Sequence, residues 1–180
     1  MGFLRRMAEA ILPKTASNIA MSEEEVDLAR SLAEKGDAQA QANLGAMYCD
    51  GVGVPENNFE AVQWYRKATD QGHALAQFSL GYMYDKGRGV PQDYAEAVKC
   101  YRMAAEQGDA DAPLMMGNMY ASGKGVPKDH VAAHMWFILA ATSGHEAARP
   151  LLSVYKEDLT PDQIAEAQRM AREWMAKHQQ

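Results

Sequence analysis

A 36-residue period runs through the middle of the chain and constrains its fold more than any other feature. Gly45, Gly81 and Gly117 are 36 residues apart. The same step separates three further sets, which are Tyr48, Tyr84 and Tyr120, then Pro55, Pro91 and Pro127, and then Gly72, Gly108 and Gly144. A fixed period of this length is typical of repeat architectures, in which each unit packs only on its neighbours. We therefore expect a stacked array of short repeats.

The composition favours helices and argues against two kinds of partner. The chain has 180 residues, 12 of them methionine, and alanine is abundant. Both are good helix formers. The net charge is −6 and the sequence holds no basic stripe or RNA-binding motif, so we expect no nucleic acid partner. No apolar run approaches the roughly 18 residues that span a bilayer, so we expect no transmembrane segment.

Each repeat reads as two helices joined by a short loop. The expected repeats are residues 37–72, 73–108 and 109–144, with first helices at 38–50, 74–86 and 110–122 and second helices at 57–70, 93–106 and 129–142. Apolar and small residues at helical spacing should form the core. In the first repeat they are Ala40, Leu44, Met47, Tyr48, Ala61, Trp64, Tyr65 and Ala68. Small residues such as Gly45 should let the helices approach closely.

The loop inside each repeat follows the pattern Gly-x-Gly-Val-Pro, at residues 51–55, 87–91 and 123–127. The first glycine suits a left-handed helix end, and the proline prevents the helix from continuing. A phosphate-binding loop is the alternative, but it needs a preceding strand, and its Walker form needs Gly-Lys-Ser/Thr. Since neither is present, we interpret the loops as structural.

The two ends of the chain depart from the repeat. Residues 22–36 read as a degenerate half repeat, with Ser22 as its N-cap. Residues 1–21 carry apolar residues at helical spacing, such as Phe3 and Ile11, and we interpret them as an N-terminal capping or docking helix. A signal peptide, a partner-docking helix and a membrane-surface helix remain alternatives. Residues 145–180 read as a partial repeat followed by a capping helix at 161–177, which begins with the capping box Thr160-Pro-Asp-Gln163.

The motif Ala-x-Ala-Gln-x-x-Leu-Gly-x-Met-Tyr, followed by Gly-x-Gly-Val-Pro, is nearly complete at residues 74–91. Its second half, Ala-x-x-(Trp/Cys)-(Tyr/Phe)-x-x-Ala-x-x-x-Gly, occurs at 61–72, 97–108 and 133–144. These residues resemble the Sel-one-like repeat, a relative of the tetratricopeptide repeat. The resemblance implies an all-α, right-handed α-solenoid and a role as an adaptor in protein complexes.

A secreted branch of that family carries a disulfide in each repeat. This chain has only Cys49 and Cys100, at positions that are not equivalent in their repeats. We therefore expect two free thiols in a reducing compartment, which predicts a cytoplasmic location, with the periplasm as the alternative.

Two motifs suggest chemistry, and we interpret both as structural. The disulfide-bearing branch has been described as binding penicillins. In this chain, Ser153-Val-Tyr-Lys156 has the Ser-x-x-Lys spacing of a penicillin-reactive serine. The Ser-Asp-Asn and Lys-Thr-Gly motifs that accompany such a serine are missing. His130 and His134 are four residues apart, yet zinc needs a third ligand. We predict no catalytic residue, metal or cofactor, and we interpret His73 and His145 as turn or cap residues.

The candidate binding residues are those that differ between repeats while sharing one face of the first helix. We call these twelve positions the variable stripe, and they are Gln39, Asn43, Ala46, Asp50, Leu75, Ser79, Tyr82, Lys86, Asp111, Met115, Asn118 and Ser122. The first helices of such solenoids line the concave side. We therefore predict a non-enzymatic interaction module that holds a peptide or helix of a partner protein. A permanently bound accessory subunit and a penicillin-binding hydrolase are the alternatives.

Overall fold

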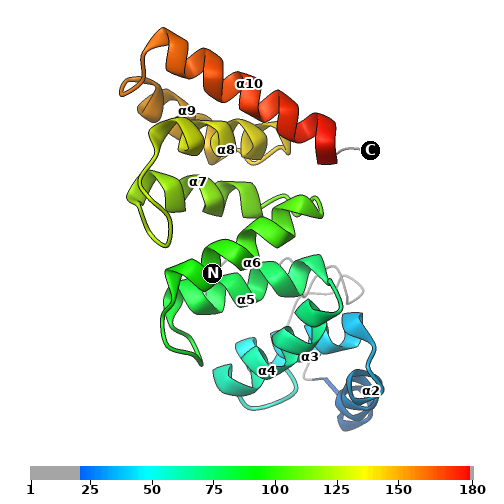
Figure 1. The fold of residues 1–180 in the computed structure, drawn as a ribbon. Helices are drawn as coiled ribbons and strands as arrows, with labels where there is room; N and C mark the ends of the chain where they lie inside the picture. The colour runs from blue at the N-terminus through cyan, green and yellow to red at the C-terminus, as the bar shows by residue number, and fades with distance from the viewer. Residues whose placement is uncertain (1–20, 179–180) are drawn as a thin grey trace.

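The computed structural model describes residues 21–178, and every regular element in that range is an α-helix. The helices are α2 (Glu23–Glu34), α3 (Ala38–Asp50), α4 (Asn58–Asp70), α5 (Ala74–Lys86), α6 (Tyr94–Glu106), α7 (Ala112–Ser122), α8 (His130–Thr142), α9 (Ala148–Lys156) and α10 (Pro161–His178) (Figure 1). The expected all-α solenoid is confirmed, and most helix ends fall within two residues of the predicted ones. The helix expected in residues 1–21 lies outside the described residues.

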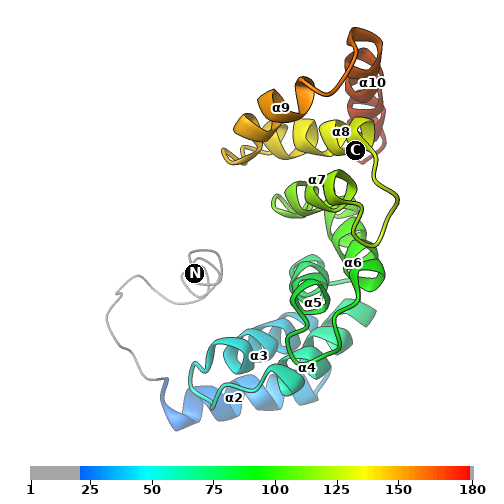
Figure 2. The same cartoon turned by 90° about the vertical axis from the view of Figure 1, so that its left-hand side faces the viewer.

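The helices stack into a curved array. Seen from the side, α3, α5, α7 and α9 follow the inner side of the curve, while α4, α6 and α8 follow the outer side (Figure 2). The first helix of each repeat therefore lines the concave side, as the sequence predicted.

Side chains at the turns fix where the helices begin. Asn57, Asp93 and Asp129 each cap the second helix of a repeat by accepting two backbone N–H bonds. Ser22 and Glu25 form a capping box at the start of α2. In the third repeat the first helix begins at Ala112 rather than 110, because the Asp109 carboxylate accepts from the Asp111 and Ala112 amides, at 3.1 and 2.8 Å.

An aromatic ring on the second helix lies over a glycine on the first helix of each repeat. A Cβ atom added at Gly45 would come within 2.8 Å of the Tyr65 ring, and one added at Gly81 within 2.9 Å of the Tyr101 ring. The third repeat pairs Gly117 with Phe137 in the same way. These rings are almost completely buried. Glycine is thus required here for close packing, which confirms the prediction for Gly45 and its equivalents.

The two glycines of each loop have different structural roles. Gly51, Gly87 and Gly123 follow the first helices with φ between +66° and +69°, the left-handed C-cap expected from the sequence. The second glycine also has positive φ, and in addition it touches the preceding repeat. A Cβ added at Gly89 would lie 2.2 Å from the Asn58 carbonyl oxygen. The sequence analysis missed this contact between repeats.

Polar contacts that recur with the period join the two helices of a repeat and also join neighbouring repeats. Gln71 donates to the Gln41 side chain at 2.8 Å, and Gln107 donates to Gln77 at 2.6 Å. The Gln41 and Gln77 side chains are buried, so these bonds satisfy groups that would otherwise be costly to hide from water. The Arg66 and Arg102 guanidinium groups each donate to a tyrosine hydroxyl of the next repeat at 2.9 Å.

Helix α10 closes the C-terminal end of the array. Its capping box is present, because Thr160 and Gln163 each accept the other's backbone N–H. It packs on α8 through Trp174, whose ring centroid lies 4.7 Å from that of Trp136, and it buries Ala167 and Ala171. Two core assignments need correction. Tyr48 and Trp64 are only half-buried and pack at the edge of the core, whereas Val62 is completely buried and belongs to the core.

Candidate interaction surface

The variable stripe belongs to α3, α5 and α7, the helices that follow the inner side of the curve, with Asp111 as the N-cap of α7 (Figure 2). Eleven of its twelve side chains are exposed or half-exposed. Buried residues occupy the other faces of these helices; on α5 they include Ala76, Leu80 and Met83. The stripe is therefore the part of the first helices that a partner can reach.

Ser79 is the exception, and its inclusion in the stripe was wrong. Its side chain is only 5% exposed, because it faces the buried Tyr65 of the preceding repeat. Burial raises the pKa of Tyr65, and the nearby Ser79 hydroxyl lowers it by a smaller amount. The equivalent positions, Asn43 and Met115, stay half-exposed. A helix position that is accessible in the first and third repeats is thus buried in the second.

Histidines at the repeat junctions hold two stripe residues in place. The His73 Nδ1 atom accepts the Ala76 amide N–H, so Nε2 carries the ring proton and donates to the Gln39 side-chain oxygen at 3.1 Å. Burial lowers the pKa of His73, which favours this neutral form. Two junctions further on, His145 lies 3.0 Å from the Asp111 carboxylate. The predicted cap role is confirmed for His73, and His145 lies in the turn before α9, whose N-cap is Ala147. Their contacts with the stripe are new.

Tyr82 lies at the middle of the stripe beside a cation. The Lys86 ammonium group is 5.7 Å from the centre of the Tyr82 ring and 2.7 Å from the Asp85 carboxylate. The hydrogen bond from Lys86 to the buried Asp85 raises the pKa of Lys86. An aromatic face and a fixed positive charge thus lie together at the centre of the inner surface.

The stripe continues on α9, which the sequence analysis did not include. Leu151 and Val154 lie 36 residues after Met115 and Asn118, and Val154 is 59% exposed. The repeat period alone would have found them. The side chains along the inner surface therefore change from amides and Asp50 on α3 to mostly apolar groups on α9.

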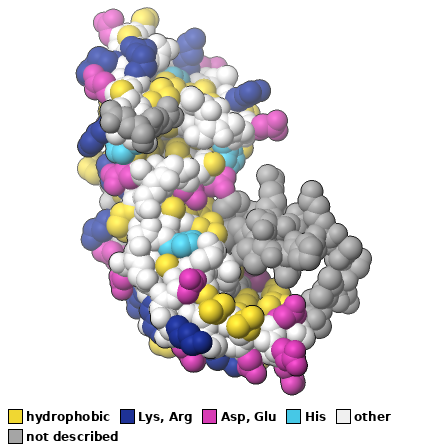
Figure 3. All heavy atoms as spheres, turned by 90° about the vertical axis from the view of Figure 1, so that its right-hand side faces the viewer, with side chains coloured by type: hydrophobic (Ala, Val, Ile, Leu, Met, Phe, Trp, Pro, Cys, Tyr) yellow, Lys and Arg dark blue, Asp and Glu magenta, His cyan; other side chains and the backbone are white. Residues whose placement is uncertain are grey.

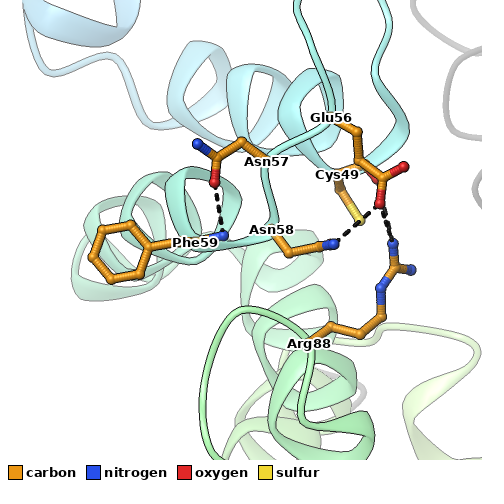
Figure 4. A network of polar contacts seen from close by, with 6 residues as sticks. All are labelled: Cys49, Glu56, Asn57, Asn58, Phe59 and Arg88. Carbon is orange, nitrogen blue, oxygen red and sulfur yellow. Dashed lines mark hydrogen bonds and ion pairs between the residues drawn. The ribbon is translucent and has the colours of Figure 1, made fainter.

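The loop of the second repeat borders the stripe and ties two repeats together. The Arg88 guanidinium lies 3.5 Å from the Glu56 carboxylate and donates to the Cys49 carbonyl at 3.4 Å, while Asn58 donates to Glu56 at 3.1 Å (Figure 4). Burial raises the pKa of the Cys49 thiol, and Arg88 lowers it by a smaller amount. Burial also raises the pKa of Cys100, to about 11. Both cysteines are buried and unpaired, as predicted.

The residues considered for chemistry do not form a reactive cluster. Ser153 and Lys156 are both exposed on α9. His130 lies 3.5 Å from Asp158, whereas His134 is buried and has its pKa lowered by burial and by Lys156. Within residues 21–178, no group of three or more His, Cys, Asp or Glu side chains is placed to hold a metal ion.

An open pocket of about 530 Å³ lies between the loop before α8 and the start of α10. Lys128, His130, Asp158 and Gln163 are among its lining residues, and none of the variable stripe contributes to it. None of the helices in the described range is both long and apolar enough to cross a membrane.

These features define the class of the protein as an α-solenoid of helix-turn-helix repeats closed by a C-terminal helix. Three Sel1 repeats match the family model at residues 38–73, 74–109 and 110–145, together well over half of the chain. The chain belongs to the Sel1 repeat family. Proteins built from these repeats are typically protein-interaction modules and are generally non-catalytic.

Solved structures support the same assignment. The chain is 36% identical to c5321, a protective antigen of uropathogenic Escherichia coli with an SLR fold, at a TM-score of 0.82. The match covers 92% of this chain and 36% of that one. A Sel1 repeat protein from Oxalobacter formigenes is 38% identical at a TM-score of 0.69, with 74% and 55% of the two chains covered. The chain thus spans about a third to a half of these relatives.

Cysteine rich protein B of Helicobacter pylori shares the fold, with a TM-score of 0.57 at 24% identity over 72% of this chain and 93% of that one. A search of curated proteins found no significant match.

Proposed function

We propose that this chain is a non-enzymatic adaptor that holds a peptide or helix of a partner protein on its inner surface. The observation that carries the proposal is the contrast between the two kinds of position on the first helices. The core positions Ala40, Gly45 and Met47 keep the same residue in all three repeats, while the accessible stripe positions differ in size, polarity and charge. Variation along one accessible face suits recognition of a particular partner.

The chemistry of the stripe suggests how the partner is held. Amides such as Asn43 and Asn118 can bond the backbone of an extended segment, and Tyr82 can serve as a central anchor. Towards the C-terminal end, Met115, Leu151 and Val154 offer an apolar surface. A partner segment that is polar at one end and apolar at the other fits this order.

Replacing Tyr82 by alanine tests the proposal. Aromatic anchors near the centre of an interface commonly cost about 2 kcal/mol or more when truncated, so binding should weaken at least tenfold. The partner is first captured from the native cell by affinity purification and mass spectrometry, and calorimetry then compares Tyr82→Ala with the wild type. Phe59→Ala is the matched control, because Phe59 is an aromatic residue that is 59% exposed on α4, away from the stripe.

Equal binding by the wild type and Tyr82→Ala would contradict the proposal. If changes at Phe3 or Ile11 abolished binding instead, the chain would be an accessory subunit docked through its N-terminal segment. Detectable turnover of β-lactams, lost in Ser153→Ala, would support the hydrolase alternative.

A further inference from the structure

Helix α2 occupies the place of a second helix in an additional, leading repeat. Gly36, just after its end, has φ +96°, and Gly72, which is 36 residues later, has φ +79°. Val26 of α2 is buried, as is its equivalent Val62 on α4. The loop of the first repeat also reaches back to α2, since a Cβ on Gly53 would lie 2.8 Å from Val26. Helix α2 thus contacts the loop of the following repeat, as α4 and α6 do.

The other face of α2 is open. In the first complete repeat, Ala61, Tyr65 and Ala68 are at most 1% exposed, because they pack on the first helix of their own repeat. Their equivalents on α2 are Glu25, Ala29 and Leu32. Ala29 is partly buried against the core of the first repeat, whereas Glu25 is exposed and Leu32 is 42% exposed. Leu28 beside it is 60% exposed.

Two large apolar side chains one helical turn apart form an apolar strip on this end of the array. Figure 3 shows hydrophobic side chains gathered at the surface there, next to acidic ones. The acidic residues of α2 are Glu23, Glu24 and Glu25 in its first turn.

The sequence just before α2 carries the residues that this face lacks. The core positions Ala40, Leu44, Met47 and Tyr48 of α3 correspond, 36 residues earlier, to Leu4, Ala8, Ile11 and Leu12. All four are apolar, although the loop glycines are missing from this segment. The close contact of Gly45 with Tyr65 corresponds to Glu9 with Ala29, so the small and the large residue have changed places.

We propose that residues 2–12, which end just before Pro13, form the first helix of a leading repeat and pack on the exposed face of α2, over Leu32 and beside Ala29. The chain is contiguous with α2, and its apolar positions are in the register that the other repeats use. Covering this face would give the array an N-terminal unit that hides its apolar strip, as the ends of solenoids require.

A designed disulfide between positions 9 and 29 tests the proposal. A Cβ on Gly45 would lie 3.2 Å from Cγ of Tyr65, so the Cβ atoms at these two equivalent positions lie within disulfide reach. Glu9→Cys with Ala29→Cys, in a full chain carrying Cys49→Ala and Cys100→Ala, should form an intramolecular disulfide at least tenfold faster than the control. The control pairs Glu9→Cys with Asp27→Cys, because Asp27 is exposed on the opposite face of α2.

Equal rates in the two variants would overturn the proposal, and a disulfide-linked dimer would show that a second copy covers α2 instead. Single cysteine variants give an independent measurement if the double variant folds poorly. A cysteine at Leu32, which is 42% exposed, should react with a thiol reagent at least tenfold more slowly than one at Asp27. Comparable reaction would show an open face and would likewise overturn the proposal.

Discussion

At the scale of single residues, the two glycines of each loop share a backbone conformation but have different neighbours. Gly87 and Gly89 have φ of +66° and +70°. A Cβ at Gly87 would approach Gln92 no closer than 3.3 Å, whereas one at Gly89 would overlap the backbone of Asn58 in the preceding repeat. The first glycine therefore serves the helix end, and the second serves the contact between repeats.

Alanine substitutions at these two glycines should separate the two effects. Gly87→Ala should lower the free energy of unfolding by about 1–2 kcal/mol, the cost of a left-handed conformation for a residue with a Cβ. Gly89→Ala carries the same backbone cost and must also push two repeats apart, which adds about 1–3 kcal/mol. Urea denaturation measures both variants. Equal losses would show that the contact of Gly89 with the preceding repeat does not contribute to stability.

At the scale of elements, α10 protects what the last repeat would otherwise expose. Trp136 of α8 is 1% exposed, and it lies at the position of Trp64 in the first repeat, which is only half-buried. The difference arises because α10 covers α8 with Trp174 and its buried alanines.

Removing residues 159–180 should therefore expose the apolar face of α8 and cause self-association. Light scattering should detect the association, while circular dichroism checks the remaining helices. Trp174→Ala is a milder variant and should destabilise the fold by about 1–3 kcal/mol, because the Trp174 ring is partly buried against the core. Arg172→Ala, on the exposed side of α10, is its control. A truncated chain that stayed monomeric and fully helical would show that α10 is not a cap.

At the scale of the whole molecule, the array hides both cysteines in its interior. Cys49 and Cys100 are at most 4% exposed and unpaired. Burial raises both thiol pKa values, so little of the reactive thiolate is present near neutral pH.

Both cysteines should resist a thiol reagent at pH 8 in the native protein and react fully once it is unfolded. Because the folded-state pKa of Cys100 is raised from 9.0 to about 11, the unfolded thiol ionises first, and stability should fall as pH rises from about 9 to 11. Cys100→Ala should show a weaker dependence, since it lacks this thiol. Unfolded protein without free thiols would overturn the assignment of unpaired cysteines.

Local patterns were enough to predict the helices and part of the site. The sequence predicted helix starts at Ser22 and Thr160 and helix ends at the loop glycines, and the structure confirms them. These caps depend on bonds made within a few residues. Eleven stripe residues were placed on an accessible face from helical spacing alone. Whether those residues bind a partner is a separate matter, and it stays a prediction.

The period by itself determined the class of fold, because repeats of about 36 residues with one apolar face per helix can bury that face only by stacking. The tertiary structure decided what depends on the neighbouring repeat. Ser79 is buried against Tyr65, and Gly89 lies against the backbone of Asn58. Val62 is completely buried, whereas Trp64 is only half-buried. These outcomes rest on contacts between residues far apart in the chain, and the spacing within one helix carries no information about them.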